Sequence, residues 1–352
     1  MKHANIAVFV PHVGCPNQCS FCNQKTISGQ QSAPTGEDAA AICKAALTHC
    51  KRDAEIAFFG GSFTAIPRDY MLELLQAVQP FIGEGKFRGI RISTRPDAIN
   101  EEILQLLQRY HVTSIELGVQ SMDDEILRKN RRGHTAAHVK QAVVLIRNYP
   151  FELGLQFMPG LCGDTEESIR ETAETIADLQ PDTVRIYPTL VLQGTELADW
   201  YKTGRYEPLT LEKAVELCAD LLLFFEERQI RVIRVGLHAS EGMEGQLLAG
   251  PYHPAFRELC ESRIFYRNAL AQLQNKEKTK AYHLFTAPAA LSKMNGQNGE
   301  NLRKLRERGW NIKIKPDSAC SGREIIIREF TKERKRRDSE EYAVKSIADP
   351  GL

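Results

Sequence analysis

Short apolar or alternating runs recur along the first part of the chain, and segments with helical periodicity separate them. The runs are residues 6–13, 55–59, 89–94, 114–119, 152–158 and 183–191. The helical segments are residues 36–51, 68–81, 100–109, 135–148 and 165–179. Regular alternation of strands and helices is typical of a parallel sheet. Because the crossovers of such a sheet are right-handed, we expect six units to curl into an α/β fold, a partial (β/α)6 barrel of the TIM type.

The pattern changes towards the C-terminus. The predicted elements there are a strand at 281–285, helices at 287–294 and 300–308, strands at 310–315 and 324–330, and a final helix at 332–347. We therefore divide the chain into a barrel domain, residues 1–250, and a smaller α+β module, residues 251–352. The turn Gly296-Gln297-Asn298-Gly299 between the two predicted helices gives the element order of a KH domain, whose GxxG loop clamps single-stranded nucleic acid. The alternative is a small extension that caps the open barrel.

Composition and charge narrow the class of protein. With 352 residues, 42% hydrophobic and 26% charged, the chain is neither fibrous nor wholly disordered. Apolar runs are far shorter than the ~20 residues that span a bilayer, and the run at residues 6–10 is too short for a secretory signal. We therefore expect a soluble, cytoplasmic protein with no membrane partner. Residues 301–337 carry 13 Lys and Arg against five Asp and Glu, a local charge of +8, which favours either an anionic partner or a solvated tail.

Three of the nine cysteines stand close together near the N-terminus. Cys15, Cys19 and Cys22 directly follow the first predicted strand. An odd number of cysteines in a chain without an export signal argues against a disulfide framework. A tetrahedral zinc site would need a fourth ligand, and neither His12 nor His49 completes a paired spacing. Three thiolates with an open fourth position suit an iron–sulfur cluster, although zinc binding by the motif alone stays open.

Several residues that follow the other predicted strands are suited to binding. The chemistry of a parallel barrel lies at the C-terminal ends of its strands. Gly60, Gly61 and Ser62 follow the second strand, and adjacent glycines let the backbone approach a ligand closely. Gln156 is a polar residue in an otherwise apolar run, so it needs a hydrogen-bonding partner in a ligand or a neighbouring strand. Arg128 has the guanidinium fork that suits a carboxylate, or it pairs with Asp124 one helical turn away.

The cysteine spacing C-x3-C-x2-C, with Phe21 before the last cysteine, resembles the cluster loop of radical S-adenosylmethionine (SAM) enzymes. The resemblance implies that Cys15, Cys19 and Cys22 bind a 4Fe–4S cluster whose fourth iron binds SAM. It implies reductive cleavage of SAM to a 5′-deoxyadenosyl radical, with an electron donor such as ferredoxin or flavodoxin as a partner. The SAM-binding residues that it implies are Gly60 and Gly61 for the methionine part, Gln120 for the ribose, Arg128 for the carboxylate, and Ser62 and Gln156.

Further motifs resemble the radical SAM half of the catalytic subunit of Elongator, over residues 5–240. They are residues 94–97, 118–121, 132–134, 185–190, 193–195 and 200–206. That enzyme modifies the wobble uridine of tRNA, so the resemblance implies an RNA substrate, tRNA. We find no segment that corresponds to its acetyltransferase domain, so acetylating chemistry is not implied. Tyr187, Arg95 and Lys202 are candidates to face the substrate, and no catalytic acid or base is assigned.

Two other functions remain as alternatives. The compact cysteine loop also resembles that of oxygen-independent coproporphyrinogen oxidase, which would make the protein a radical SAM enzyme acting on a small molecule such as a tetrapyrrole. The other alternative is a non-catalytic RNA-binding iron–sulfur protein. Cleavage of SAM and binding of RNA are the two properties that separate these hypotheses.

Overall fold

The computed structural model describes residues 5–11, 13–15, 18–29, 32–49, 54–237 and 244–330. They belong to two compact units, residues 1–254 and 255–352. Along the described residues, none of the helices combines the length and the apolar character needed to cross a bilayer.

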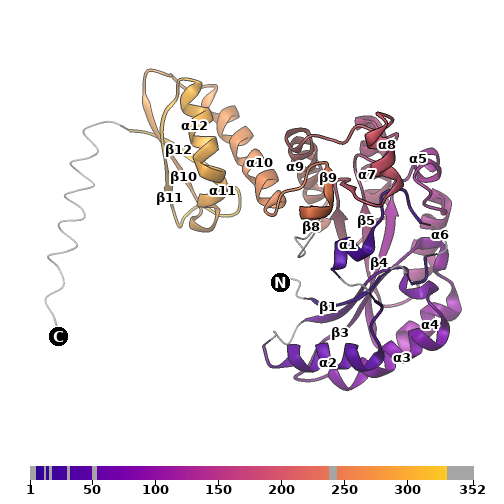
Figure 1. Ribbon diagram of the computed structural model, residues 1–352. Helices are drawn as coiled ribbons and strands as arrows, with labels where there is room; N and C mark the ends of the chain where they lie inside the picture. The colour runs from indigo at the N-terminus through magenta and orange to yellow at the C-terminus, as the bar shows by residue number, and fades with distance from the viewer. Residues whose placement is uncertain are drawn as a thin grey trace, which may run out of the picture. The chain divides into compact units, whose positions relative to one another are not determined.

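A curled sheet of seven parallel strands is the framework of the first unit (Figure 1). In spatial order the strands are β1 (Asn5–Val10), β2 (Glu55–Gly60), β3 (Gly89–Thr94), β4 (Val112–Gln120), β5 (Glu152–Phe157), β6 (Thr183–Ile186) and β8 (Arg231–Val235). Each strand pairs in parallel with the next. Among the described strands β1 and β8 remain the two edges, so the sheet is an open, partial barrel. The predicted fold class is confirmed.

Two details of the strand prediction are wrong. The sheet has a seventh strand, β8. It was not predicted because its five residues, Arg-Val-Ile-Arg-Val, lack the apolar density that marks the other strands. The predicted strand at 183–191 divides into β6 and the short strand β7 (Val191–Leu192), which pairs with β9 (Leu247–Ala249) in a separate two-stranded sheet. Pro188 lies between β6 and β7 and has no N–H to donate to the ladder.

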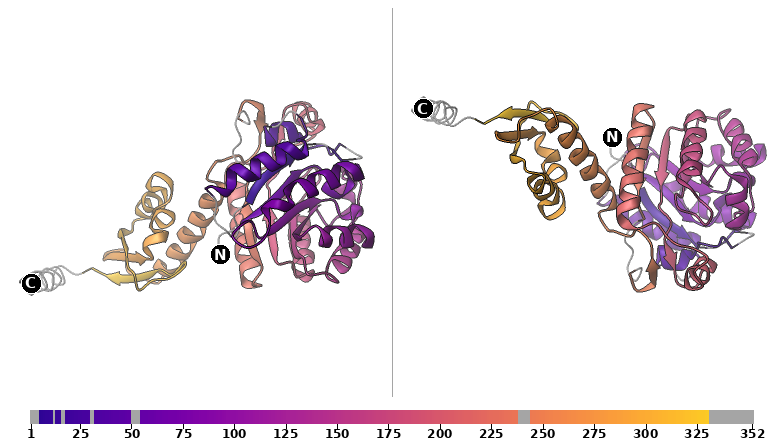
Figure 2. Two further views of the ribbon diagram at one scale, coloured as in Figure 1. Left: turned by 90° about the horizontal axis from the view of Figure 1, so that it is seen from below. Right: turned by 90° about the horizontal axis from the view of Figure 1, so that it is seen from above.

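Helices cover the convex face of the seven-stranded sheet (Figure 2). The main ones are α2 (Gly36–Leu47), α3 (Arg68–Val78), α4 (Glu101–Arg109), α6 (Ala136–Ile146), α7 (Glu166–Asp178) and α9 (Leu211–Glu227). The five helices predicted from periodicity are among them. Thr35, Asn100, Thr135 and Thr165 cap four of these helices by accepting a backbone N–H from the first turn, which stabilises each by about 1 kcal/mol. Shorter helices are α1 (Gln24–Ser28), α5 (Asp124–Lys129) and α8 (Glu196–Lys202).

The concave side of the sheet carries an ion network where a closed barrel would carry apolar layers. Arg91 on β3 is fully buried and donates to Glu55, Glu116 and Glu152 over distances of 2.8, 2.9 and 2.8 Å. Arg185 on β6 donates to the same Glu116 oxygen over 2.7 Å. Since Glu55 and Glu152 are the first residues of β2 and β5, the network fills the barrel at the N-terminal ends of the strands.

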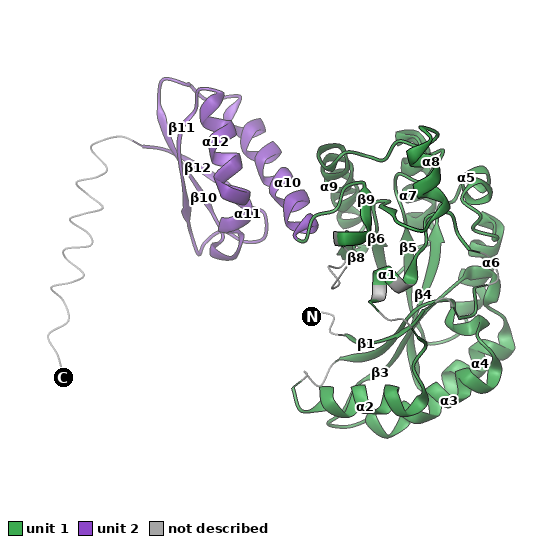
Figure 3. Ribbon diagram, viewed as in Figure 1, with its two compact units in different colours: residues 1–254 green, residues 255–352 purple. Residues whose placement is uncertain are grey.

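The second unit packs helices against one face of a small mixed sheet (Figure 3). Its elements are α10 (Phe256–Leu273), β10 (Ala281–Thr286), α11 (Leu291–Asn295), α12 (Glu300–Glu307), β11 (Asn311–Pro316) and β12 (Ile326–Glu329). The central strand β10 pairs in parallel with β11 and antiparallel with β12. Elements from residue 281 onward lie where the sequence predicts them, whereas α10 was not predicted and the predicted helix at 332–347 lies outside the described residues. Gly296 and Gly299 adopt the positive φ of a tight turn, and the KH interpretation stays a prediction.

Candidate functional site

A cavity of about 530 Å³ lies on the concave side of the first unit, along the C-terminal ends of its strands. Its volume falls within the range of small-molecule sites, roughly 300–1,000 Å³. The predicted site residues that line it are Cys15, Cys19, Cys22, Gly60, Gly61, Ser62, Gln120 and Gln156. Every residue predicted to bind the cluster or SAM, except Arg128, therefore lines one common space.

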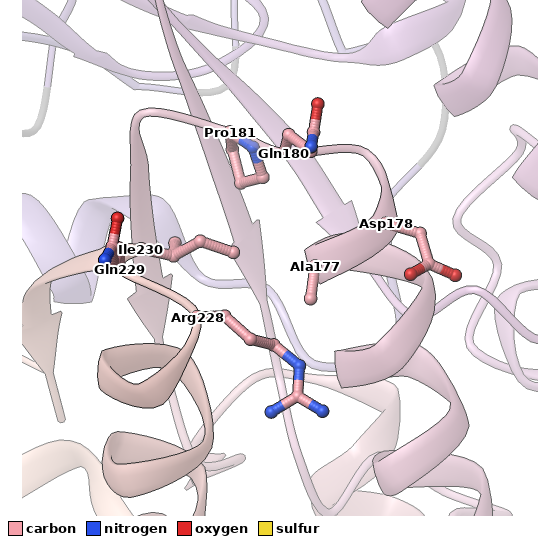
Figure 4. A pocket seen from close by; sticks show the side chains of 7 residues that line it. All are labelled: Ala177, Asp178, Gln180, Pro181, Arg228, Gln229 and Ile230. Carbon is pink, nitrogen blue, oxygen red and sulfur yellow. The ribbon is translucent and has the colours of Figure 1, made fainter.

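A second hollow lies at the opposite ends of two strands (Figure 4). It is formed by the turns that lead into β6 and β8, and its lining residues are Ala177, Asp178, Gln180, Pro181, Arg228, Gln229 and Ile230. Arg228 stacks on Phe224, with its guanidinium carbon 3.7 Å from the ring centroid. The N-terminal end of a barrel serves stability rather than chemistry, so we assign the functional site to the larger cavity.

Close backbone contacts hold the cysteine loop against the turn that follows β2. The N–H of Gly61 donates to the carbonyl of Val10 over 2.8 Å. A Cβ on Gly61 would lie 2.2 Å from the carbonyl oxygen of Val13, and one on Gly14 would lie 2.5 Å from that of Ser62. Real Cβ atoms do not approach backbone atoms so closely, so only glycine allows the two segments to pack at this distance.

Arg132 connects the cysteine loop to β4. It is 8% exposed, and its two terminal nitrogens donate to Cys19 Sγ over 3.5 Å and to the carbonyl of Gly118 over 2.7 Å. Nearby, the N–H and hydroxyl of Ser20 donate to the carbonyl and side-chain oxygens of Asn130 over 3.1 and 3.0 Å. The chain after α5 thus fixes the loop from one side and brings a positive charge to a thiol.

The three thiols lie close enough to affect one another. Burial, together with the neighbouring Cys19 and Cys15, raises the pKa of the Cys22 thiol to about 12, and Arg132 opposes this rise. The Cys22 thiol therefore stays protonated unless a cation binds it, and a coordinating metal deprotonates thiols outright. Among the described residues, no three His, Cys, Asp or Glu side chains converge on a single ion. In an iron–sulfur cluster each thiolate binds its own iron, so the trio fits a cluster without converging.

Polar atoms in the cavity wall lack partners within the described structure. Gln120 is 5% exposed, its backbone has φ +69°, and its Oε1 accepts no hydrogen bond. The Nε atoms of Arg132 and Arg185, which also line the cavity, are likewise buried without an acceptor. Buried polar groups in native proteins are almost always hydrogen-bonded, so this wall is built for a ligand rich in donors and acceptors.

Arg128, which was predicted to bind a carboxylate, does not reach the cavity. Its side chain is 77% exposed and pairs with Glu125 over 3.2 Å, rather than with the predicted alternative Asp124. The chain turns back after α5 through residues of positive φ, so Arg132 faces the cavity in its place. In the sequence Arg132 stands out only as part of a motif, because nothing in the pattern fixes where α5 ends.

Of the three residues predicted to face the substrate, one lines the cavity and two do not. Tyr187 lines the cavity, whereas Lys202 is exposed on α8. Arg95 is 2% exposed and forms a bidentate pair with Asp97 over 2.9 and 2.8 Å. Burial alone would raise the pKa of Asp97, but the Arg95 guanidinium outweighs this effect and holds the pKa below its usual range. Arg95 is therefore committed to a structural ion pair.

Two aromatic rings and three polar side chains that line the cavity are here called the lumen end (Phe9, Phe59, Glu116, Arg185 and Tyr187). Phe9 and Phe59 are register partners on β1 and β2, with ring centroids 6.3 Å apart. The Arg185 guanidinium lies 5.2 Å from the Phe59 centroid and donates to the Tyr187 hydroxyl over 3.3 Å. The lumen end thus offers flat apolar surface beside fixed hydrogen-bonding groups.

Comparison with known proteins gives consistent matches. The model of the radical SAM superfamily matches residues 9–176, and that of the radical SAM C-terminal domain matches residues 181–265. The tRNA uridine(34) acetyltransferase of Dehalococcoides mccartyi is 26% identical over 302 residues, which are 73% of this chain and 64% of that protein. Elongator complex protein 3 of Saccharomyces cerevisiae is 31% identical over 196 residues, which are 50% of this chain and 35% of that protein.

A solved structure shares the fold. The archaeal Elp3 of Methanocaldococcus infernus aligns with a TM-score of 0.61 and 22% identity, covering 76% of this chain and 64% of that one. This chain thus spans less than two thirds of these relatives. The two family matches run from residue 9 to residue 265 with a gap of four residues, and they include the end of β1, the cysteine loop and the other six strands of the barrel. The chain therefore belongs to the radical SAM superfamily, and it is a radical SAM enzyme that uses a 4Fe–4S cluster and S-adenosylmethionine.

Proposed function

We propose that this radical SAM enzyme acts on tRNA and modifies a base, with uracil as the base that its cavity fits best. Two relatives that match much of the chain carry names that refer to tRNA uridine or to Elongator. The observation that carries the proposal is the lumen end, where two aromatic rings stand beside a buried carboxylate and a guanidinium in the same cavity as the three cysteines.

In this proposal Cys15, Cys19 and Cys22 hold the cluster. When bound, the reduced cluster supplies the electron that splits SAM into methionine and the 5′-deoxyadenosyl radical, which removes a hydrogen atom from the substrate. A ferredoxin or flavodoxin delivers that electron. Arg132 donates to Cys19 Sγ over 3.5 Å and so places positive charge beside one of the proposed cluster ligands. The buried position of Cys19, 7% exposed, keeps bulk water from its sulfur.

The residues proposed to hold SAM are those of the cavity wall next to the cysteines. Gly60, Gly61 and Ser62 line the cavity from the end of β2 and the turn that follows it, and they present backbone groups to it. Gln120 and Gln156 offer amide groups from β4 and β5, and Gln120 Oε1 is the buried acceptor that has no partner within the described residues. Arg132, rather than Arg128, is positioned to attract a carboxylate.

The lumen end matches the edge of a uracil ring. That edge presents a carbonyl, an N–H and a second carbonyl in sequence. Glu116 is 3% exposed; its Oε1 accepts from Arg91 and Arg185, and its Oε2 accepts from Ser93 Oγ over a longer distance, 3.4 Å. Oε2 can therefore accept the N–H, while Arg185 Nε and the Tyr187 hydroxyl can donate to the carbonyls. Phe9 and Phe59 supply the faces on which a base stacks.

The test is to follow hydrogen from tRNA into the product. The full chain is reconstituted anaerobically with iron and sulfide, reduced with dithionite, and incubated with SAM and tRNA isolated from a strain that lacks the gene and was grown in deuterated medium. We expect about four irons per chain and deuterium in 5′-deoxyadenosine, detected by mass spectrometry. Nucleosides of tRNA from that strain should lack one modification that the complemented strain contains.

Matched cysteine variants separate cluster binding from folding. Cys19→Ala should remove both iron and SAM cleavage, whereas Cys43→Ala, which changes a buried cysteine of α2, should retain both. Cleavage retained by the Cys19 variant would refute the ligand assignment. If 5′-deoxyadenosine forms without deuterium and the nucleosides of the two strains are identical, the enzyme acts on something other than tRNA.

A further inference from the structure

The sheet of the second unit has one covered face and one open face. Tyr282 and Leu284 on β10 and Ile312 on β11 belong to the core beneath the helices and are at most 4% exposed. Residues that alternate with them point the other way, because successive side chains of a strand lie on opposite faces. We call this second surface the open face. Its positions are Ala281, His283, Phe285, Asn311, Lys313, Lys315, Ile326, Arg328 and Phe330.

Aromatic rings form a row along the middle of the open face. His283 and Phe285 are two residues apart on β10, with ring centroids 6.0 Å apart in an edge-to-face arrangement. Phe330 follows β12, donates its N–H to the carbonyl of Ala281 over 2.7 Å, and brings its ring to 4.7 Å from that of His283. All three side chains are half-buried. A row of partly exposed rings on a sheet is costly in water unless something covers it.

Basic side chains border the aromatic row on both sides. Lys313 and Lys315 on β11 are the register partners of His283 and Phe285, and both lysines are exposed. On the other side, the Arg328 guanidinium of β12 lies 4.9 Å from the Phe285 centroid and 3.7 Å from Asp317. The charged side chains at the strand positions of the open face are these two lysines and this arginine, so the surface is positively charged around its rings.

We propose that the open face binds single-stranded RNA. Unpaired bases stack on aromatic rings of a sheet, and flanking Lys and Arg neutralise the phosphates. A duplex hides the faces of its bases, and a second copy of this face would bring like charges together. The surface is distinct from the Gly296–Gly299 turn, which joins α11 and α12 on the covered face. The choice of RNA over DNA rests on the proposed function, whereas the surface itself does not depend on the radical chemistry.

The test measures binding of labelled oligonucleotides to the reconstituted full chain by fluorescence anisotropy. The probes are a fluorescein-labelled uridine 12-mer, the deoxythymidine 12-mer and an RNA duplex of equal length. The charge variant Lys313→Ala/Lys315→Ala is compared with Arg303→Ala/Lys304→Ala, which removes two basic side chains of α12 beside the GxxG turn. Both pairs change the net charge equally. Lys313, Lys315 and Arg303 are exposed, Lys304 is half-buried and pairs with Glu300 over 2.6 Å, and none of the four belongs to the core of the unit.

We expect the single-stranded RNA to bind more tightly than the duplex. The Lys313/Lys315 variant should weaken binding and lower the slope of log K against log salt by about 1.4, since each phosphate contact on a single strand contributes about 0.7. The Arg303/Lys304 variant should bind as the unchanged chain does. Phe285→Leu should weaken binding about fivefold or more, because a stacked base contributes about 1–3 kcal/mol.

If the Arg303/Lys304 variant loses affinity and the Lys313/Lys315 variant does not, the proposal is overturned in favour of the GxxG side. Equal affinity for the duplex, or no binding of the uridine 12-mer, would also overturn it, and tighter binding of the deoxythymidine 12-mer would refute the choice of RNA. Loss of a tRNA modification in cells with no 12-mer binding in vitro would reject the open face but not the proposed function. Binding through this face with unchanged tRNA nucleosides would reject the proposed function but not the open face.

Discussion

Removing Arg91 should destabilise the first unit far more than removing Arg88, although the two arginines share carboxylate partners. Arg91 is fully buried and neutralises Glu55, Glu116 and Glu152. Arg88 contacts Glu55 over 2.7 Å and Glu152 over 3.7 Å, but 47% of its side chain is exposed. Methionine at either position keeps a long side chain and removes only the charge and its hydrogen bonds.

The magnitudes follow from burial. Taking one partner from a buried ion pair costs about 3–5 kcal/mol. Arg91→Met takes the fully buried partner from Glu55 and Glu116, which keep only Arg88 and Arg185. An exposed ion pair contributes at most about 1 kcal/mol, which is the limit for Arg88→Met. A combined Arg91→Met/Glu55→Gln variant should recover part of the loss, since it also removes the charge of one buried carboxylate that has lost this partner.

The dependence of stability on pH is an independent test of this ion network. Burial alone would raise the pKa of Glu55, but Arg91 and the hydroxyls of Ser114 and Thr113 outweigh it and hold the pKa at about 2, against 4.5 for the free group. A lowered pKa stabilises the fold above pH 4.5, and this stability is lost as the pH falls towards 2. The difference corresponds to about 3 kcal/mol. Arg91→Met removes the largest contribution that lowers the pKa of Glu55 and leaves the hydroxyls of Ser114 and Thr113 in place, so the slope should shrink.

Urea unfolding followed by tryptophan fluorescence measures both effects. The chain has two tryptophans, Trp200 in the first unit and Trp310 in the second. In a Trp310→Phe background the fluorescence reports the first unit alone, so the two units do not have to unfold together. The reasoning is refuted if the two arginine variants lose equal stability, or if Arg91→Met keeps the slope of the unchanged chain between pH 4.5 and pH 2.

Three further changes test the cavity. Gly61→Ala should lower the iron content after reconstitution, because its Cβ would lie 2.2 Å from the Val13 carbonyl oxygen and force the loop apart; full iron content would contradict this. Gln120→Ala should weaken SAM binding measured by calorimetry by about fivefold or more, since one net hydrogen bond is worth about 1 kcal/mol, whereas Arg128→Ala should leave it unchanged. Glu116→Gln should reduce deuterium transfer from tRNA without reducing the 5′-deoxyadenosine formed in the absence of tRNA; equal loss of both would place Glu116 outside substrate recognition.

The fold could be predicted from the sequence because its strands are locally distinct. The run at residues 89–94 was predicted with the bounds of β3, and threonine or asparagine caps mark the starts of several helices. The missed elements have weaker signals. Strand β8 contains two arginines in five residues, and α10 has buried residues on much of its surface, including Glu261 and Ser262, so it lacks a clear apolar stripe.

The site could be predicted less completely, because two of its features depend on tertiary structure. The sequence cannot show that α5 ends at Lys129, and this ending decides that Arg132 rather than Arg128 reaches the cavity. Nor does an arginine inside the apolar run of β3 reveal its partners, because Glu55 and Glu152 lie 36 and 61 residues away in the chain. By contrast, the three cysteines and the paired glycines each lie within a short segment, so their motifs can be recognised from the sequence alone.

The ion network links the stability of the barrel to the properties of its cavity. In a closed barrel, layers of branched apolar residues fill the interior and leave no space there. Here Arg91 and its carboxylates fill only one end, so Phe9 and Phe59 keep a surface that a ligand can cover. Glu116 belongs to both parts, since it binds Arg91 within the network and lines the cavity. Substitution of Glu116 should therefore change stability and substrate recognition together, whereas substitution of Glu55, which does not line the cavity, should change stability alone.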